Sequence, residues 1–272
     1  MRQVRGSGLY PAVAVGSFRR YATYRAATAA GVFTNTVFGL ILAYTFAALW
    51  SERPQLGGYD EAQALTFVWV GQSMLAAISL IGGGFQDELQ ERIRSGDVAV
   101  DLHRPADLQL WWLASDLGRS LFELVARGVV PLTVGALVFE LALPASPVRW
   151  LLFAVALVPA MLVSFGIRYL VGLSAFWLLD GTGVARMSTV VSSFFSGMLL
   201  PLTVFPGAFG EFVQWLPWAA MLQVPVDVLL GRHSGAGTAG VLALSAAWAI
   251  ALLAVGRLVQ SVATRRVVVQ GG

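Results

Sequence analysis

The chain has 272 residues, of which 57% are hydrophobic and only 12% are charged, and its mean hydropathy is +0.72. Because a soluble domain is about one quarter charged, this composition excludes a soluble protein of the same size and predicts a membrane protein built from helices. The absence of cysteine excludes disulfides, the two distant histidines argue against a histidine-based metal site, and the scattered arginines argue against nucleic acid as a partner.

The first element, residues 1–26, is predicted to be an amphipathic segment that lies at the membrane surface. Its apolar side chains fall on one helical face, and its arginines lie elsewhere. These apolar residues are Leu9, Val13, Phe18, Tyr21 and Tyr24. The apolar run is too short for a signal peptide, and a disordered tail is the alternative for the stretch before Pro11.

Six membrane-spanning helices are expected after this segment, because the chain contains several uncharged runs of about 20 residues or more. Their expected ranges are 27–50, 62–84, 120–143, 149–178, 186–205 and 236–258. The third is the most polar, since it contains Glu123, Arg127 and Glu140. Glu123 and Arg127 are four residues apart and are expected to pair near the inner surface; a role in transport is the less favoured alternative.

The distribution of arginine predicts that both termini are cytoplasmic. With this orientation, 15 of the 18 arginines fall on the cytoplasmic side, and only Arg53, Arg149 and Arg232 fall outside. Such an excess of positive charge on the inner side is the usual determinant of membrane topology. The expected fold is therefore an all-α membrane protein with six spans and with the N and C termini inside.

Charge is concentrated in residues 85–107, the loop after the second expected span. The run FQDELQERIRS predicts a short helix with Phe85, Leu89 and Ile93 on one face, and Gly96 marks its end. A solvated loop is the alternative. An apolar stripe on so charged a helix needs a cover, however, so docking against a cytoplasmic protein is favoured.

Residues 201–232, between the fifth and sixth expected spans, are apolar and aromatic but are interrupted by four prolines. The segment is too short for two further spans and must begin and end outside. It is therefore predicted to form short re-entrant or interfacial helices, with Trp215 and Trp218 near the lipid head groups. A plain extracellular loop is the alternative.

The last expected span begins with small residues at every fourth position, namely Gly235, Ala239, Ala243, Ala247 and Ala251. Small residues let membrane helices approach closely, so this face is expected to pack against a neighbouring helix. The start of the span also matches the glycine pattern of a dinucleotide-binding loop, but no strand precedes it, so that interpretation fails.

Four stretches of the chain, in this order between about residues 15 and 262, carry a resemblance to a known family. They are the amphipathic N-terminal segment, the charged stretch FQDELQERIRSGDVAVDLHRPAD, the stretch SAFWLLDGTGV, and the proline-broken stretch SGMLLPLTVFPGAFGEFVQWLPW. Together they resemble a permease of the ABC-2 exporter superfamily, in particular the bacterial permeases of similar length that pair with separate ATPase subunits.

The resemblance implies that residues 1–272 form a single transmembrane domain of an exporter in the bacterial cytoplasmic membrane. It implies a second permease subunit, identical or paralogous, and two ATPase subunits that hold ATP and magnesium, so no cofactor, metal or catalytic residue is expected on this chain. The residues that are implied to couple to the ATPase are Phe85, Glu88, Leu89, Glu91, Arg92 and Ile93.

The resemblance also implies a translocation path, and a hydrophobic small molecule, such as a drug or an antibiotic, is favoured as the substrate. The candidate path residues are polar or aromatic positions in the spans: Asn35, Phe38, Phe67, Gln72, Phe194 and Phe195. Hydrogen bonding between helices and plain packing are the alternatives for these side chains. For the whole protein, the alternatives are export of a lipid or a glycan, and a membrane scaffold that transports nothing.

Overall fold

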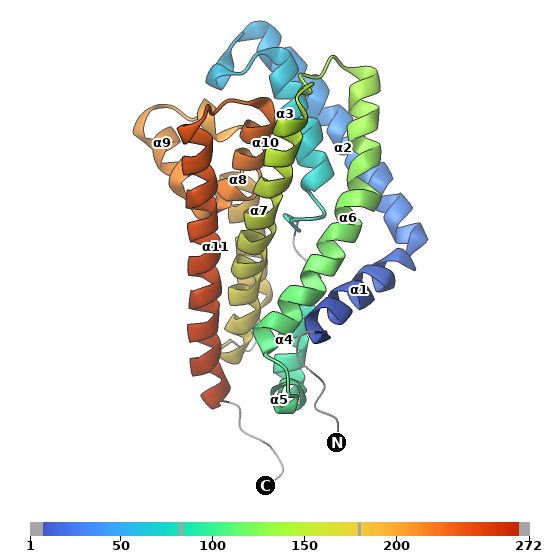
Figure 1. Cartoon of the computed structure of the whole chain (residues 1–272), viewed down its shortest axis with the longest axis vertical. Coiled ribbons are helices and arrows are strands. Elements are labelled where there is room, and N and C mark those ends of the chain that lie inside the picture. The colour runs from blue at the N-terminus through green and yellow to red at the C-terminus, as the bar shows by residue number, and fades with distance from the viewer. Residues whose placement is uncertain (1–7, 82–83, 179–180, 267–272) are drawn as a thin grey trace.

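The computed structural model describes residues 8–81, 84–178 and 181–266, which are almost entirely helical and contain no strand. Parts of the expected segments at residues 1–26, 62–84 and 174–184 lie outside the described residues. The long helices run side by side, and α1, α4, α5 and the end of α11 lie at the same end of the bundle (Figure 1). The all-α class is therefore confirmed, whereas the cytoplasmic location of this end stays a prediction.

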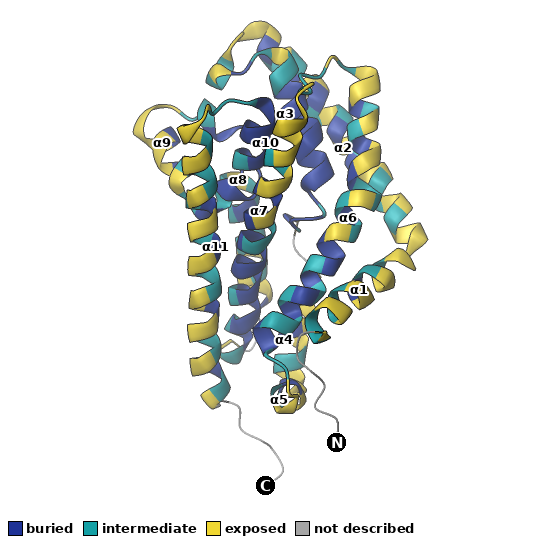
Figure 2. Cartoon of the chain, viewed as in Figure 1, coloured by how far each residue is buried: buried dark blue, intermediate teal, exposed yellow. Residues whose placement is uncertain are grey.

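Within the described residues, four helices are long and apolar enough to cross a membrane. They are α2 (Arg25–Glu52), α6 (Leu108–Val138), α7 (Pro147–Leu173) and α11 (Ala236–Ala263). Half of the most apolar window of α7 is buried within the chain, against 17–22% for the other three. Helix α7 is therefore the centre of the bundle, and the others present long exposed faces to their surroundings (Figure 2).

The second and fifth expected spans are shorter helices than the sequence predicts. Helices α3 (Glu61–Met74) and α8 (Thr182–Phe195) have 14 residues each. At about 1.5 Å per residue, each rises only about 21 Å, against about 30 Å for a bilayer core. The expected helix over 62–84 is wrong beyond Met74, because residues 75–81 form turns. The six-span topology is not confirmed and stays a prediction.

The third expected span, 120–143, is wrong at both ends, because α6 begins at Leu108 and ends at Val138. Its start is fixed by Asp107, whose Oδ1 accepts a hydrogen bond of 2.8 Å from the backbone N–H of Leu110. The sequence placed this boundary too late because ionisable residues in the first half of α6 resemble those of a loop. In the structure, the first half of the helix buries them.

The amphipathic N-terminal helix is present as α1 (Leu9–Ala22), and α6 covers one face of it (Figure 1). The rings of Phe18 and Phe122 meet edge to face, with centroids 5.5 Å apart. Gly118 lets the two backbones approach closely, since a Cβ atom there would lie 2.0 Å from the carbonyl oxygen of Ala14. Tyr24 lies beyond the helix and is exposed, so it does not share this face.

The proline-broken segment forms four short helices rather than one long one. They are η3 (Leu202–Val204), α9 (Gly207–Trp215), η4 (Pro217–Ala220) and α10 (Gln223–Leu230). Helix α10 is almost completely buried and packs on α7, whereas Phe209, Phe212 and Trp215 of α9 are exposed. The expected short helices are confirmed, and their depth in the membrane stays a prediction.

The expected packing face of α11 is wrong. All five small residues at every fourth position, from Gly235 to Ala251, are exposed, and the helix instead packs on α7 through a face that holds Ser245, Ala249 and Gly256. An α-helix has 3.6 residues per turn, so a spacing of four turns by about 40° at each step and winds away from any straight neighbour. The observed face follows the spacings of three and four that keep residues on one side.

We expect Ala249→Leu to destabilise the protein more than Ala247→Leu, because only Ala249 is buried, with 2% of its surface exposed. Overpacking of this kind costs about 1–3 kcal/mol, whereas an exposed position accepts the larger side chain. Thermal unfolding of the purified protein in detergent measures both variants. An equal loss of stability in the two, or a larger loss in Ala247→Leu, would contradict the observed packing face.

Candidate functional site

Backbone carbonyl groups in the turns after α3 accept hydrogen bonds from side chains of α6. The carbonyl of Ala76 also accepts a bond of 3.2 Å from the backbone N–H of Ser79. Arg119 donates to the carbonyl oxygens of Ala76, at 2.8 Å, and Ala77, at 3.0 Å. The hydroxyl of Ser120 also donates to Ala77, at 2.8 Å. Lipid offers no donors, so a helix can stop at this depth only where protein groups satisfy its carbonyls.

Helix α7 supplies the next donor and links it to a buried ion pair. Ser164 donates through its hydroxyl to the carbonyl oxygen of Ile78 at 2.5 Å, and Arg168 donates to Ser164 at 3.2 Å. Arg168 also donates to both carboxylate oxygens of Asp116, at 2.5 and 3.2 Å, and Arg119 donates to the same carboxylate at 2.8 Å. At most 6% of each of these three charged side chains is exposed.

We call Asp116, Arg119 and Arg168 the buried charge cluster. It carries one negative and two positive charges, and the carbonyl oxygens of the turns compensate the excess positive charge. Sequence reasoning missed the cluster because Asp116 and Arg119 were placed in a loop. Their spacing of three residues, which puts both on one helical face, was the signal that could have found it.

Helix α4 (Phe85–Ser95) has the range and the apolar stripe that the sequence predicts, but this chain covers the stripe itself. Phe85 stacks on Phe165 of α7 with ring centroids 4.9 Å apart, and Leu89 is fully buried. Gly172 makes room for Leu89, since a Cβ atom there would lie 2.8 Å from a methyl carbon of that side chain. This burial corrects the expectation that Phe85 and Leu89 insert into another subunit.

The remaining coupling candidates divide between the two sides of α4. Ile93 is half-buried, whereas Glu88 and Glu91 are exposed. Arg92 pairs with Asp101 of α5 (Val98–His103) through two hydrogen bonds, of which the one from Nη2 is 2.8 Å long, and this bonding raises the pKa of Arg92. The outward face of α4 is therefore charged and exposed, and at its edge Glu88 lies 3.8 Å from Arg20 of α1.

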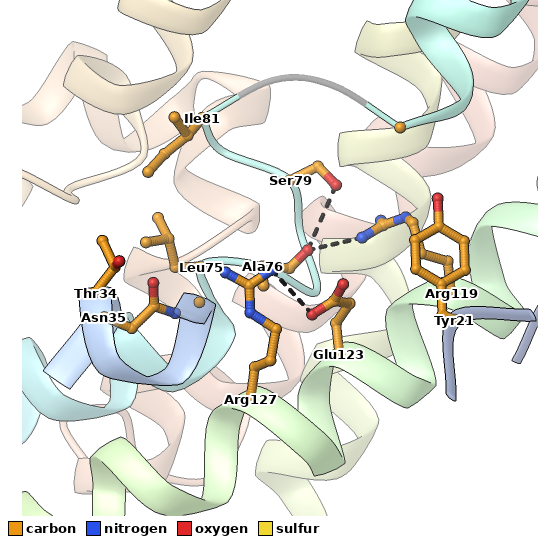
Figure 3. A pocket seen from close by; sticks show the side chains of 12 residues that line it. Tyr21, Thr34, Asn35, Leu75, Ala76, Ser79, Ile81, Arg119, Glu123 and Arg127 are labelled. Atoms are coloured by element: carbon orange, nitrogen blue, oxygen red, sulfur yellow. Dashed lines mark hydrogen bonds and ion pairs between the residues drawn. The ribbon is translucent and has the colours of Figure 1, made fainter. Parts of the chain in front are cut away.

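A cavity of about 370 Å³ lies on the other side of the turns after α3, between α1, α2 and α6 (Figure 3). Its polar lining includes Tyr21, Asn35, Ser79, Glu123 and Arg127. Glu123 and Arg127 form the expected ion pair, with Nη1 and Oε2 3.3 Å apart. The cavity therefore has a polar lining and lies next to the turns at residues 75–81, where α3 ends.

The structure does not bring the six path candidates together. Asn35 lines the cavity and donates to the backbone carbonyl of Gln72 at 3.4 Å, and Phe67 is buried in the core. Phe38 is exposed on α2, and Phe194 and Phe195 contact each other on α8. Their role in a translocation path stays a prediction.

A second polar cluster fixes the opposite end of the bundle, and sequence reasoning missed it. The hydroxyl of Tyr59 donates to Asp227 of α10 and accepts a bond of 2.7 Å from Gln223. Arg232 lies 3.8 Å from the centre of the Tyr59 ring and donates to the carbonyl oxygen of Gly58 at 2.7 Å. Burial and the neighbouring carboxylate raise the pKa of Tyr59 well above its usual value, so the phenol keeps its proton.

Helices that are long and apolar enough to cross a membrane, a charged helix at one end and a cavity within the bundle together describe a membrane protein. The chain belongs to the ABC-2 family transporter protein family, whose sequence model matches residues 33–271. Members of this family are the transport component and are not themselves catalytic. No curated protein sequence matches the chain.

We expect Asp116→Asn to destabilise the protein by about 3–5 kcal/mol, because it leaves two buried arginines without their shared counter-ion. The matched control is Asp87→Asn on the exposed side of α4, which should change stability little. Thermal unfolding in detergent measures both. If Asp116→Asn were as stable as Asp87→Asn, the cluster would not hold the bundle together.

Proposed function

We propose that this chain is the transmembrane permease subunit of an ATP-driven exporter in a bacterial cytoplasmic membrane. A second permease subunit completes the translocation path, and two separate ATPase subunits bind ATP and magnesium. The substrate is a hydrophobic small molecule, such as a drug or an antibiotic. The aromatic side chains among the candidate path residues favour a substrate of this class. Membership of the ABC-2 family, together with the two unlike faces of α4, carries this proposal.

The two faces of α4 suit a coupling element. One face is fixed to α7 through Phe85 and Leu89, and the opposite face presents Asp87, Glu88 and Glu91. A partner that contacts the charged face would move the helix as a rigid piece, because its buried face has no freedom to slide. Charges on such a surface set the register of docking more than its strength. The ATPase contact therefore lies on the charged face.

Displacement of α4 would reach the buried charge cluster directly. The guanidinium of Arg168 lies 4.8 Å from the centre of the Phe85 ring, and the same guanidinium pairs with Asp116 of α6. Arg119, which shares Asp116, holds the turns after α3. A movement that begins at α4 is thus passed to α6, α7 and the end of α3 through a short chain of bonds.

We expect Glu91→Arg to weaken association with the ATPase and to abolish substrate-stimulated ATP hydrolysis, because it reverses a charge on the exposed face of α4. Helix α4 is not one of the helices that are expected to cross the membrane, so Glu91→Arg should not change membrane insertion or folding. Co-purification of the ATPase with the tagged permease, followed by an ATPase assay, measures the effect.

The matched control is Glu211→Arg, the same charge reversal at an exposed position of α9 at the other end of the bundle. It should associate with the ATPase and stimulate hydrolysis as the parent does. Wild-type behaviour of Glu91→Arg would rule out the charged face as the contact. Failure of the parent itself to retain any ATPase would count against an ATP-driven exporter.

A further inference from the structure

The ion pair between Glu123 and Arg127 in the cavity is largely buried but has few hydrogen bonds. Only 7% of the surface of Glu123 is exposed, yet its Oε2 has no hydrogen bond to the described residues and only the 3.3 Å ion-pair contact with Nη1 of Arg127. The Nε of Arg127 is likewise buried without a hydrogen-bond partner. Buried polar atoms without hydrogen bonds lower the stability of a protein, and charged ones do so more. Glu123 and Arg127 both line the same cavity, so one molecule bound there can contact both side chains.

The position of Arg127 is imposed by the fold. Its guanidinium rests against Gly31 of α2, where a Cβ atom would lie 2.1 Å from Nη2. The side chain therefore bridges from α6 to α2, and 25% of it remains exposed, against 9% of the side chain of Glu123. The cavity thus presents a carboxylate deep inside and a guanidinium nearer its mouth, about one ion-pair distance apart.

A ligand that complements these two charges is a zwitterion that binds with its cationic group deepest in the cavity, next to Glu123. An ammonium group would donate to Glu123, and a phosphate oxygen would accept from Arg127. Arg119 also lines the cavity, but Asp116 and the carbonyl oxygens of Ala76 and Ala77 already occupy its donors. The remaining charges at the site are therefore one of each sign.

The mouth of the cavity continues onto an apolar surface. Thr34 at its edge is exposed, and Phe38 and Ile41 follow on α2 at spacings of four and three, with 57% and 56% of their surface exposed. Residues at these spacings share one helical face, so the three form a continuous stripe along a crossing helix. An acyl chain that extends from the cavity would lie on this stripe.

We infer that the cavity binds the phosphoethanolamine head group of a membrane amphiphile from the leaflet on the α1 side, with its acyl chain along Phe38 and Ile41. Its volume, about 370 Å³, is at the lower end of the range for small-molecule sites and suits a head group without its chains. This binding needs neither ATP nor a partner subunit, so the inference goes beyond the proposed function.

The test is native mass spectrometry of the purified full-length protein in detergent, with added phosphatidylethanolamine or phosphatidylglycerol of identical acyl chains. Phosphatidylglycerol lacks the ammonium group, and we expect it to bind about tenfold more weakly. Glycerophosphoethanolamine, which has the head group without chains, should also bind about tenfold more weakly than the lipid. Equal binding of the two lipids would show that the cavity does not select a zwitterionic head group. Equal binding of glycerophosphoethanolamine and phosphatidylethanolamine would show that the acyl chains, and hence the membrane, contribute nothing.

Variants locate the binding in the cavity. Thr34→Trp, at the exposed mouth, should reduce phosphatidylethanolamine binding about tenfold. The matched control is Thr133→Trp on α6, since Thr133 is also exposed and its hydroxyl, like that of Thr34, donates to the carbonyl four residues earlier, at 2.9 Å in both. Equal binding by Thr34→Trp and Thr133→Trp would place the lipid elsewhere.

Glu123→Gln keeps the shape of the side chain and should abolish the preference for phosphatidylethanolamine over phosphatidylglycerol. A preference that survives in Glu123→Gln would overturn the role of the carboxylate. Because the measurement contains no ATPase, selective lipid binding by a protein that exports nothing would support this site and count only against the proposed function.

Discussion

The carbonyl groups where α3 stops are bound by side chains of other helices, and a lipid environment has no donors that could replace these side chains. Arg119 provides two of these donors, and Asp116 holds Arg119 in place while it also binds Arg168. The long helices α6 and α7 and the turns that follow α3 are therefore joined by one set of hydrogen bonds. A buried ion pair usually adds little net stability, but here the ions replace the backbone bonds that a continuous helix would have made.

The same cluster relates the two regions to which we assign roles. On one side, Arg168 lies over the ring of Phe85 and so contacts α4, the proposed coupling helix. On the other side, the cavity is lined by Arg119, by Glu123 and by Ser79 in the turns after α3 (Figure 3). A rearrangement of the turns after α3 would therefore change the shape of the cavity and the seat of α4 together. This geometry gives a physical route between the proposed ATPase contact on α4 and the cavity inside the bundle.

Local patterns predicted the features whose causes are local. The range of α4 follows from its apolar spacing and from Gly96, and the short helices of 201–232 follow from their prolines. The end of α3 could not be predicted in this way, because residues 75–81 are apolar except for Ser79 and several donors to their carbonyl groups lie on other helices. Nor could the sequence show that α7 would cover Leu89, or that Tyr59 would meet Asp227, since both contacts depend on how distant segments pack.

The order of synthesis gives the break in α3 a further consequence. Arg119 and Ser164, which bind its carbonyl groups, follow their partners by 43 and 86 residues in the chain. While the ribosome is still extending the chain beyond α3, neither donor exists, so these two bonds cannot yet form. The turns at residues 75–81 gain them only after the segments of α6 and α7 have been synthesised. The bonds that fix the end of α3 are thus supplied by later parts of the chain.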